Sequence, residues 1–191
     1  MVFKQAFLSA VAALSVLATP AAAQLGGYDS DAFVKAVRER DGAKVMELLE
    51  SRGTPVLNSR DGKGETGLII AISKRDDLLT SFLLQEGADP DLAARDGDTP
   101  LIAAARIGYT QAAAQLLQRK AKVDAANRMG ETALIIAVQQ RHVPLVKLLL
   151  EAGADPDKTD SAAGYSARDY ARRDTRSREI LNLIEAKQPK A

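Results

Sequence analysis

One short phrase occurs three times in this chain at a constant interval, and that interval limits what the chain can fold into. The phrase reads Gly64-Glu65-Thr66-Gly67-Leu68, Gly97-Asp98-Thr99-Pro100-Leu101 and Gly130-Glu131-Thr132-Ala133-Leu134, which defines a 33-residue period. A weaker copy, Gly164-Tyr165-Ser166-Ala167, follows one residue late. Self-similarity at a fixed period of about 20 to 50 residues is typical of solenoids, in which each repeat contacts only its neighbours.

Each copy of the phrase precedes two short helical patterns. Thr66, Thr99 and Thr132 stand where a hydroxyl can accept a hydrogen bond from the first helical turn, so each is predicted to begin a helix. Apolar residues then recur at helical spacing, as in residues 101–105 of a first helix and residues 145–150 of a second. Such a helix pair has apolar residues facing both neighbours, so the pairs must stack to bury them.

The 33-residue period combines Gly-x-Thr-Pro-Leu, an alanine-rich helix, a Leu-Leu pair and a Gly-Ala-Asp loop, and in this it resembles the ankyrin repeat. The resemblance implies an all-α solenoid of stacked antiparallel helix pairs joined by hairpin-like turns. We therefore expect an ankyrin repeat domain over residues 28–187. It would consist of an N-terminal cap (28–60), three full repeats (61–93, 94–126 and 127–159) and a C-terminal cap (160–187), followed by a tail (188–191).

The loops after the second helices lead to two further expectations. Lys120 stands where the neighbouring repeats have Gly87 and Gly153, so we expect a lysine at positive φ, at a cost of about 1 kcal/mol, and a loop that differs from its neighbours. Aspartates recur in these loops once per repeat and are expected to accept hydrogen bonds from backbone amides of adjacent repeats. They are Asp91, Asp124 and Asp157.

Residues 1–23 differ in kind from the rest. A positively charged start, an apolar stretch over residues 6–18 and the small residues Ala21-Ala22-Ala23 form the pattern of a secretory signal peptide, too short to span a bilayer. We expect cleavage before Gln24, a flexible lead-in over residues 24–27 and a first helix capped by Ser30. The mature protein is then expected in the periplasm, with the extracellular medium as the alternative, and without membrane insertion.

Composition narrows the classes of partner. The chain has no cysteine, which excludes disulfides and thiolate metal sites and suits an oxidising compartment. Removal of residues 1–23 takes one lysine from 26 basic residues and leaves as many basic as acidic side chains, 25 of each. Proteins that hold phosphate backbones carry a basic excess, so we expect no nucleic-acid partner.

Three local patterns suggest chemistry but have simpler explanations. Residues 62–67 match the dinucleotide fingerprint G-x-G-x-x-G, yet no buried strand precedes them and the 33-residue register accounts for their glycines. His142 is the only histidine, and no Gly-x-Ser-x-Gly elbow accompanies it. The loops Asp89-Pro90-Asp91 and Asp155-Pro156-Asp157 offer too few oxygens for Ca²⁺, which takes about six to eight. We therefore predict no catalytic residue, no cofactor, no metal site and no enzyme.

The function that the resemblance implies is protein recognition. Ankyrin repeats bind their partners through a concave face made of turn tips and the exposed side of the first helices. Carried over residue by residue, that face consists of Lys63, Ser73, Lys74, Arg95, Asp96, Arg106, Ile107, Arg128, Met129, Gln139 and Gln140.

Within this face, Arg106, Ile107 and Met129 are predicted to form an apolar centre with a charged rim, contributing to binding and little to folding. The partner is expected to be another protein, and the chain a monomer. Two alternatives stay open: a structural spacer without a defined partner, and a small hydrolase with a site around His142. The shallow groove of a solenoid with one histidine offers an enzyme little.

Overall fold

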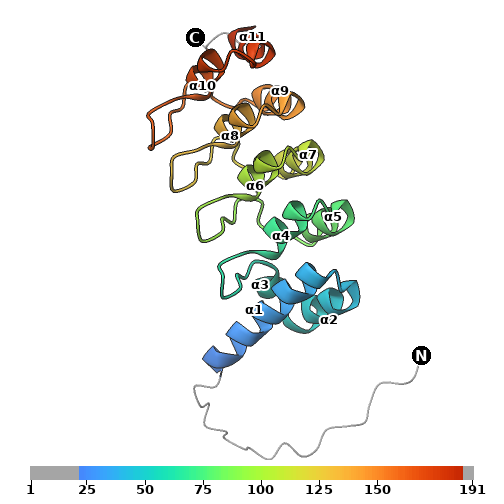
Figure 1. Ribbon diagram of the computed structural model, residues 1–191. Coiled ribbons are helices and arrows are strands. Elements are labelled where there is room, and N and C mark those ends of the chain that lie inside the picture. Colours follow the sequence, from blue (N-terminus) through green and yellow to red (C-terminus); the bar gives the residue numbers. More distant parts are fainter. Residues whose placement is uncertain (1–21, 187–191) are drawn as a thin grey trace, which may run out of the picture.

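The structure, a computed structural model, describes residues 22–186 as a file of stacked helices (Figure 1). Helix pairs follow one another in sequence order from α1 and α2 at one end to α10 and α11 at the other. The helices are α1 (Ala22–Glu39), α2 (Gly42–Arg52), α3 (Thr54–Leu57), α4 (Gly67–Ser73), α5 (Asp77–Gln85), α6 (Pro100–Arg106), α7 (Thr110–Gln118), α8 (Ala133–Gln139), α9 (Val143–Glu151), α10 (Ala167–Arg173) and α11 (Arg178–Ala186).

Extended structure between residues 22 and 186 is limited to three isolated antiparallel bridges. They join Arg60 to Thr66, Ala126 to Thr132 and Thr159 to Ser166, at the bases of the turns that precede α4, α8 and α10. The expected all-α solenoid with hairpin-like turns is therefore confirmed. Within the same part of the chain, every helix is too short or too polar to cross a membrane.

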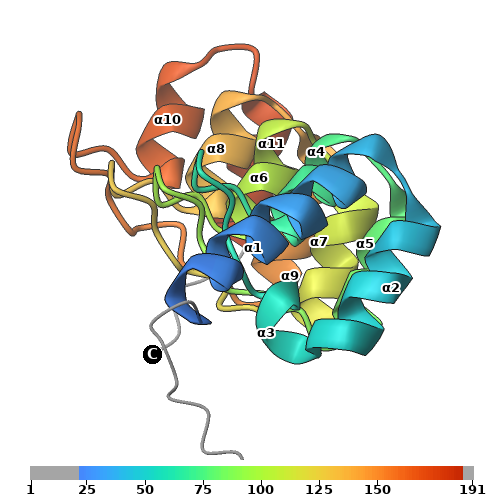
Figure 2. The same cartoon turned by 90° about the horizontal axis from the view of Figure 1, so that it is seen from below.

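The helices form two layers, seen end-on in Figure 2. The first helices α4, α6, α8 and α10 stack on one another, and the second helices α5, α7, α9 and α11 stack beside them. The core lies between the layers, where Leu101, Leu116, Ile135 and Leu149 are at most 2% exposed. Each of these side chains belongs to a different helix of the two central pairs, so that burial depends on stacking, as the sequence predicts.

The first helices begin where the hydroxyls predict. Thr66, Thr99 and Thr132 accept hydrogen bonds from the amides of the third helical residue at 3.2, 3.3 and 3.3 Å. Ser166 does the same for α10, and its own backbone amide donates in return to the carboxylate of Asp169 at 3.0 Å, a reciprocal capping box. These caps satisfy amide groups that would otherwise be buried without a partner.

Glycines with positive φ shape the hairpins before these helices. In the first hairpin, the amide of Gly64 donates to the carbonyl of Asp61 at 2.8 Å, and Gly64 has a φ of 82°. Gly97 and Gly130 occupy the same place in the next two hairpins, with φ of 89° and 75°. A four-residue turn that ends in a left-handed residue is a common way to close a short hairpin, which explains the constant spacing of these glycines.

The N-terminal end differs from the expectation. Helix α1 begins at Ala22 and runs without a break, so residues 24–27 are helical and Ser30 lies inside the helix rather than at its cap. Glycine lowers helix propensity by about 1 kcal/mol without breaking a helix, and α1 buries Phe33 and Val37 completely. The predicted signal peptide, apart from Ala22 and Ala23, lies outside the described residues, as does the tail 188–191.

The loop between α2 and the first hairpin contains a short helix, α3. Gly53 precedes it with a φ of 70°, and Pro55 occupies its first turn. Val56 and Leu57 are buried. The extra residues of this loop therefore add apolar cover to the N-terminal end of the stack.

Lys120 has a φ of 66°, which confirms the prediction of a left-handed lysine. The loop nevertheless keeps the hydrogen bond of its neighbours. The amide of Ala121 donates to Leu116 at 3.0 Å, as the amide of Ala88 donates to Leu83 at 2.9 Å. The lysine thus adopts the conformation that glycine takes elsewhere, and the expectation of a different loop was wrong because this bond sets the chain path.

The loop acceptors connect consecutive repeats. Asp91 accepts a hydrogen bond from the amide of Lys122 at 2.8 Å, and Asp124 accepts one from the amide of Asp155 at 2.9 Å. Both bonds join neighbouring repeats and confirm the prediction for these aspartates. Asp157 instead binds the guanidinium of Arg168, with 2.6 Å to Nε, because α10 places that long side chain beside it.

Candidate functional site

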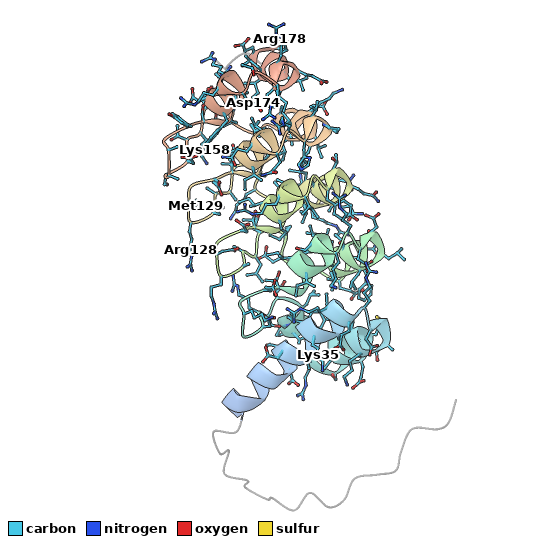
Figure 3. The ribbon with its side chains drawn as sticks, viewed as in Figure 1. Lys35, Arg128, Met129, Lys158, Asp174 and Arg178 are labelled. Carbon is cyan, nitrogen blue, oxygen red and sulfur yellow. The ribbon has the colours of Figure 1, made fainter. Side chains whose placement is uncertain are left out.

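The predicted binding residues lie on the side of the stack that carries the hairpins and the exposed edges of the first helices, which we call the hairpin face. Figure 3 shows Arg128 and Met129 at its outer edge, on the hairpin between α7 and α8. Ile107 and Gln139 are partly buried. The others are exposed: Lys63, Ser73, Lys74, Arg95, Asp96, Arg106, Arg128, Met129 and Gln140.

Four of these residues come together around one open hollow of about 530 Å³. Lys63 belongs to the first hairpin, Arg95 and Asp96 to the second, and Arg128 to the third. The remaining lining comes from the same hairpins. The hollow therefore crosses three repeats, and no single repeat could form it.

Direct stacking of the hairpins positions the two arginines. The amide of Arg95 donates to the carbonyl of Gly64 at 3.0 Å, and Nη2 of Arg95 donates to the carbonyl of Gly62 at 3.0 Å. A Cβ on Gly64 would stand 2.5 Å from the Cβ of Arg95. Arg128 lies over Gly97 in the same way, since a Cβ there would stand 3.0 Å from its Cγ. Each arginine thus occupies space that a glycine of the preceding hairpin leaves open.

Arg106 belongs to a partly buried network that joins α6 to the second and third hairpins. Its guanidinium binds both carboxylate oxygens of Asp98, with 3.0 Å from Nη2 to Oδ1, and lies 3.5 Å from Glu131. Asn127 donates to the same oxygen of Asp98 at 2.8 Å and to Glu131 at 2.9 Å. The Asp98 side chain is only 8% exposed. The hydrogen bond with Asp98 raises the pKa of Arg106.

Because of this network we expect Arg106 to contribute to folding, in contrast to the prediction from the sequence. Without Arg106, the carboxylate of Asp98 would be buried with Asn127 as its remaining side-chain partner. Sequence reasoning missed Asp98 and Asn127. A signal was present, because acids or amides recur in the 33-residue register before the first helices; they are Asp61, Glu65, Asp98, Asn127 and Glu131.

The first hairpin contains a similar network. Arg38 of α1 binds Asp61 at 2.8 Å and Glu65 at 2.7 Å. The hydrogen bond with Asp61 raises the pKa of Arg38. Burial alone would raise the pKa of Asp61, but the hydrogen bonds from Arg38 and from the amides of Glu65 and Lys63 outweigh it, and the pKa lies below its ordinary value. Glu65, one of the acids that line the hollow, is therefore neutralised by an arginine of α1.

Ile107 and Met129 do not form the predicted apolar centre. Ile107 follows the last residue of α6, where it packs against the core, and its carbonyl accepts a hydrogen bond from Arg75. Met129 precedes α8 on a hairpin tip and is 52% exposed. The stacked helices α6 and α8 have seven residues each, about 10 Å of helix, and these two residues belong to opposite ends of them. The prediction of a shared centre was wrong.

The other predicted residues lie at the far ends of the first helices. Ser73 donates to the carbonyl of Ile69 at 2.9 Å, and the carbonyl of Lys74 accepts a hydrogen bond from Arg40 at 3.3 Å. Gln139 and Gln140 end α8. The predicted face therefore divides into the hollow at the hairpins and a separate group at the turns into the second helices.

The three local patterns have structural explanations. Residues 62–67 form a hairpin tip and the start of α4, with no strand before them among the described residues. The ring of His142 covers Gly108, where a Cβ would stand 2.5 Å from Nδ1. The side chains of Asp89 and Asp155 each accept a hydrogen bond of 2.9 Å from the backbone amide of the residue two positions later. Residues 22–186 contain no cluster of three or more side chains that could hold a metal ion.

A second surface, on the outer layer, was not predicted. Met46 of α2 and Leu78 of α5 are 44% and 85% exposed and line an apolar groove of about 370 Å³. The available signal was Leu78, which stands where the next two repeats have Gln111 and Pro144. The groove is thus confined to the N-terminal end of the stack.

The comparison with protein families agrees with this architecture. The family described as ankyrin repeats, three copies, matches residues 33–126 and, in an overlapping placement, residues 68–160. These placements together cover well over half of the 191 residues. No curated protein matches the chain. The stacked helix pairs, the hairpins and this match establish that the chain belongs to the ankyrin repeat family.

Proposed function

We propose that this protein is a binding module that holds a partner protein on its hairpin face. Ankyrin repeats generally mediate protein–protein interaction. The observation that carries the proposal is the hollow lined by Lys63, Arg95, Asp96 and Arg128, which spans three repeats. The exposed Met129 follows Arg128 on the third hairpin. An exposed apolar side chain within a charged surface suits a protein interface.

The proposal is for a protein without enzymatic activity of its own. Ankyrin repeat domains are typically interaction modules rather than enzymes. An alternative hydrolase site would have to use His142, whose ring covers Gly108 on the edge of the stack remote from the hairpins. A structural spacer is the other alternative, and it differs by predicting that no defined partner binds.

We further propose that the protein acts as a monomer after export, in the periplasm. The support is the leader described above and the absence of cysteine. Cleavage before Gln24 would remove only Ala22 and Ala23 from α1, well before the buried Phe33. Intact mass of the exported protein tests the cleavage site. Light scattering tests the monomer, and full-length protein in the membrane fraction would contradict export.

Affinity capture with a matched pair of variants tests the binding function. Immobilised wild-type protein, residues 24–191, is exposed to periplasmic extract of the native host beside two triple variants. The hairpin variant carries Arg95→Ala, Arg128→Ala and Met129→Ala. The control carries Arg119→Ala, Lys147→Ala and Met46→Ala, so it also loses two cations and one methionine, from exposed positions on the outer helices.

We expect the control to capture the same protein as the wild type, and the hairpin variant to lose it with an unchanged thermal unfolding midpoint. Capture by the hairpin variant at wild-type level would contradict the assignment of this face. Loss in the control alone would instead place the interface on the outer helices, beside the groove at Met46 and Leu78.

A further inference from the structure

Three cations on the hairpin face have no anionic partner. Lys63, Arg95 and Arg128 line the hollow, one from each of three consecutive hairpins. Among the residues that the structure describes, no acidic group lies within 4.0 Å of any of the three side-chain cations. They therefore present positive charge at the surface.

The acids around the hollow are already engaged. Glu65 binds Arg38 at 2.7 Å, and Asp98 binds Arg106. One carboxylate oxygen of Asp96 accepts the amide of Asp98 at 3.0 Å. Arg38 and Arg106 thus neutralise Glu65 and Asp98, while Asp96 keeps its charge beside the three cations of the hairpins, which outnumber it.

The cations also stand in an ordered row. Arg95 and Arg128 each lie over the glycine of the preceding hairpin, and the guanidinium of Arg95 is fixed by the carbonyl of Gly62. The row ends at the third hairpin, because the fourth hairpin follows Ser161 with two alanines. Arg95 and Arg128 occupy the same position of successive hairpins, and packed helices lie about 8 to 10 Å apart, so these two charges recur at about that interval. Lys63 stands one position later in the first hairpin.

We propose that the partner presents an acidic segment in polyproline II conformation, with carboxylates on every third residue facing Lys63, Arg95 and Arg128. A polyproline II helix has three residues per turn and rises about 3.1 Å per residue, so every third side chain faces the same side and three residues match the spacing of the hairpins. This inference rests on the proposed binding function and names the chemistry of the partner.

An acidic protein segment fits this surface better than nucleic acid does. A phosphate backbone carries closely spaced charges and is held by a larger basic excess, whereas this row has three cations with Asp96 among them. The chain as a whole has 26 basic and 25 acidic residues. Widely spaced carboxylates match a row of this kind.

The test uses two synthetic peptides of identical composition. One has glutamate at every third position, three in all, separated by serine and glycine, and the other has the same three glutamates adjacent to one another. Each is titrated into isotope-labelled protein, residues 24–191, at low and at high salt. We expect the spaced peptide to shift amide signals at the tips of the first three hairpins, with an affinity that falls as salt rises.

Charge reversal provides the matched control. Arg95→Glu with Arg128→Glu is expected to weaken binding of the spaced peptide roughly tenfold, since two attractions become repulsions. Arg119→Glu with Lys147→Glu produces the same net charge on the outer helices and should change binding less than about twofold. Equal loss in both pairs would mean that only net charge matters, and would overturn the site.

Other outcomes also decide the matter. Equal affinity for the two peptides would overturn the proposed spacing of the carboxylates. Tighter binding of a single-stranded oligonucleotide than of the spaced peptide would overturn the choice of a protein segment as the partner. If neither peptide binds at millimolar concentration, the proposal of an acidic partner segment is wrong. The proposed function would still stand if the hairpin triple variant had lost its captured protein, so the two failures are distinguishable.

Discussion

Gly97 and Arg128 approach each other so closely that a Cβ on the glycine would stand 2.8 Å from the backbone nitrogen of the arginine. The same glycine has a φ of 89°, a backbone conformation that residues with a Cβ atom adopt only with strain. Two independent reasons therefore require glycine at this position. Gly87, with a φ of 98°, has only the conformational reason, because nothing lies within 4 Å of its Cβ position.

The pair Gly97→Ala and Gly87→Ala separates these two effects. Gly87→Ala should cost about 1 kcal/mol for the left-handed backbone alone. Gly97→Ala should cost a further ~1 to 3 kcal/mol, because the backbone of Arg128 must move. Urea unfolding of both variants measures the difference. Equal losses would show that the hairpins separate without strain, and would contradict the rigid stacking described here.

Arg106→Ala should reduce the free energy of unfolding by about 1 to 3 kcal/mol, because it leaves the carboxylate of Asp98 buried and poorly paired. Arg106→Lys should recover only part of this loss, since an ammonium group cannot bind both carboxylate oxygens side by side. Arg119→Ala, at an exposed position on α7's C-terminal cap, is the control. A loss of unfolding free energy below about 0.5 kcal/mol for Arg106→Ala would mean that Arg106 contributes no more to stability than an ordinary surface residue.

Ala94→Asn should stabilise the protein. Asn127, at the equivalent position of the next repeat, accepts the amides of Met129 and Glu131 at 2.9 and 3.0 Å, and Asp61 accepts two amides of its own hairpin in the same way. Ala94 cannot accept hydrogen bonds through its side chain, and because the amide of Asp98 already donates to Asp96, the new asparagine would add an acceptor mainly for the amide of Asp96. We expect a gain of about 0.5 to 1.5 kcal/mol, seen as a higher thermal midpoint. A lower midpoint would mean that the partly buried Ala94 methyl group contributes more than the missing hydrogen bonds.

Lys120→Gly should also stabilise the protein, by about 0.5 to 1 kcal/mol. The variant relieves a left-handed lysine with a φ of 66°, while the greater freedom of glycine in the unfolded chain offsets part of the gain. Lys122→Gly in the same loop is the comparison. If Lys120→Gly lowers the denaturation midpoint as Lys122→Gly is expected to do, the left-handed lysine carries no measurable strain.

Asp174 provides a pH-dependent prediction. The backbone amide of Arg176, the hydroxyl of Ser177 and the side chain of Arg141 donate to its carboxylate and lower its pKa to about 2. An aspartate with a depressed folded pKa stabilises the protein fully above its unfolded pKa of about 4 and loses that contribution as the pH falls toward 2. Asp174→Asn should therefore be less stable than the wild type at pH 6, and the gap in urea midpoint should narrow below pH 4. A gap independent of pH would contradict this charge-based account.

Much of the fold was accessible from the sequence because the 33-residue period is a covalent property of the chain. Thr99 caps α6 and Leu101 is buried, as their places in the repeat predict. The start of α1 was not accessible, since its glycines and Ser30 suggest a lead-in and only tertiary packing of residues such as Phe33 supports a helix there.

The candidate site was predicted as a set of exposed positions, and the structure divides that set by contacts between repeats. Arg106 lies in the predicted face, yet its partners Asp98 and Asn127 come from two hairpins, so its role depends on a three-dimensional junction. Ile107 and Met129 were both predicted as surface positions of neighbouring repeats, but Ile107 lies at the C-terminal end of α6 and Met129 precedes the N-terminal end of α8. Periodicity predicts which position a residue takes within a repeat, whereas contacts across repeats depend on the length of each side chain.

The loop hydrogen bonds between neighbouring repeats make the number of repeats a variable that gene duplication can change. Asp91 and Asp124 accept equivalent amides, so excision of residues 94–126 would place Asp91 opposite the amide of Asp155 and set Arg128 over Gly64. The loop hydrogen bond and the glycine contact at the new junction would have the same form as the old ones. Only the last acceptor differs, because Arg168 occupies Asp157 and closes the series to further growth at that end. The number of central repeats can therefore change in whole units, while the helix pairs at the two ends of the stack stay the same.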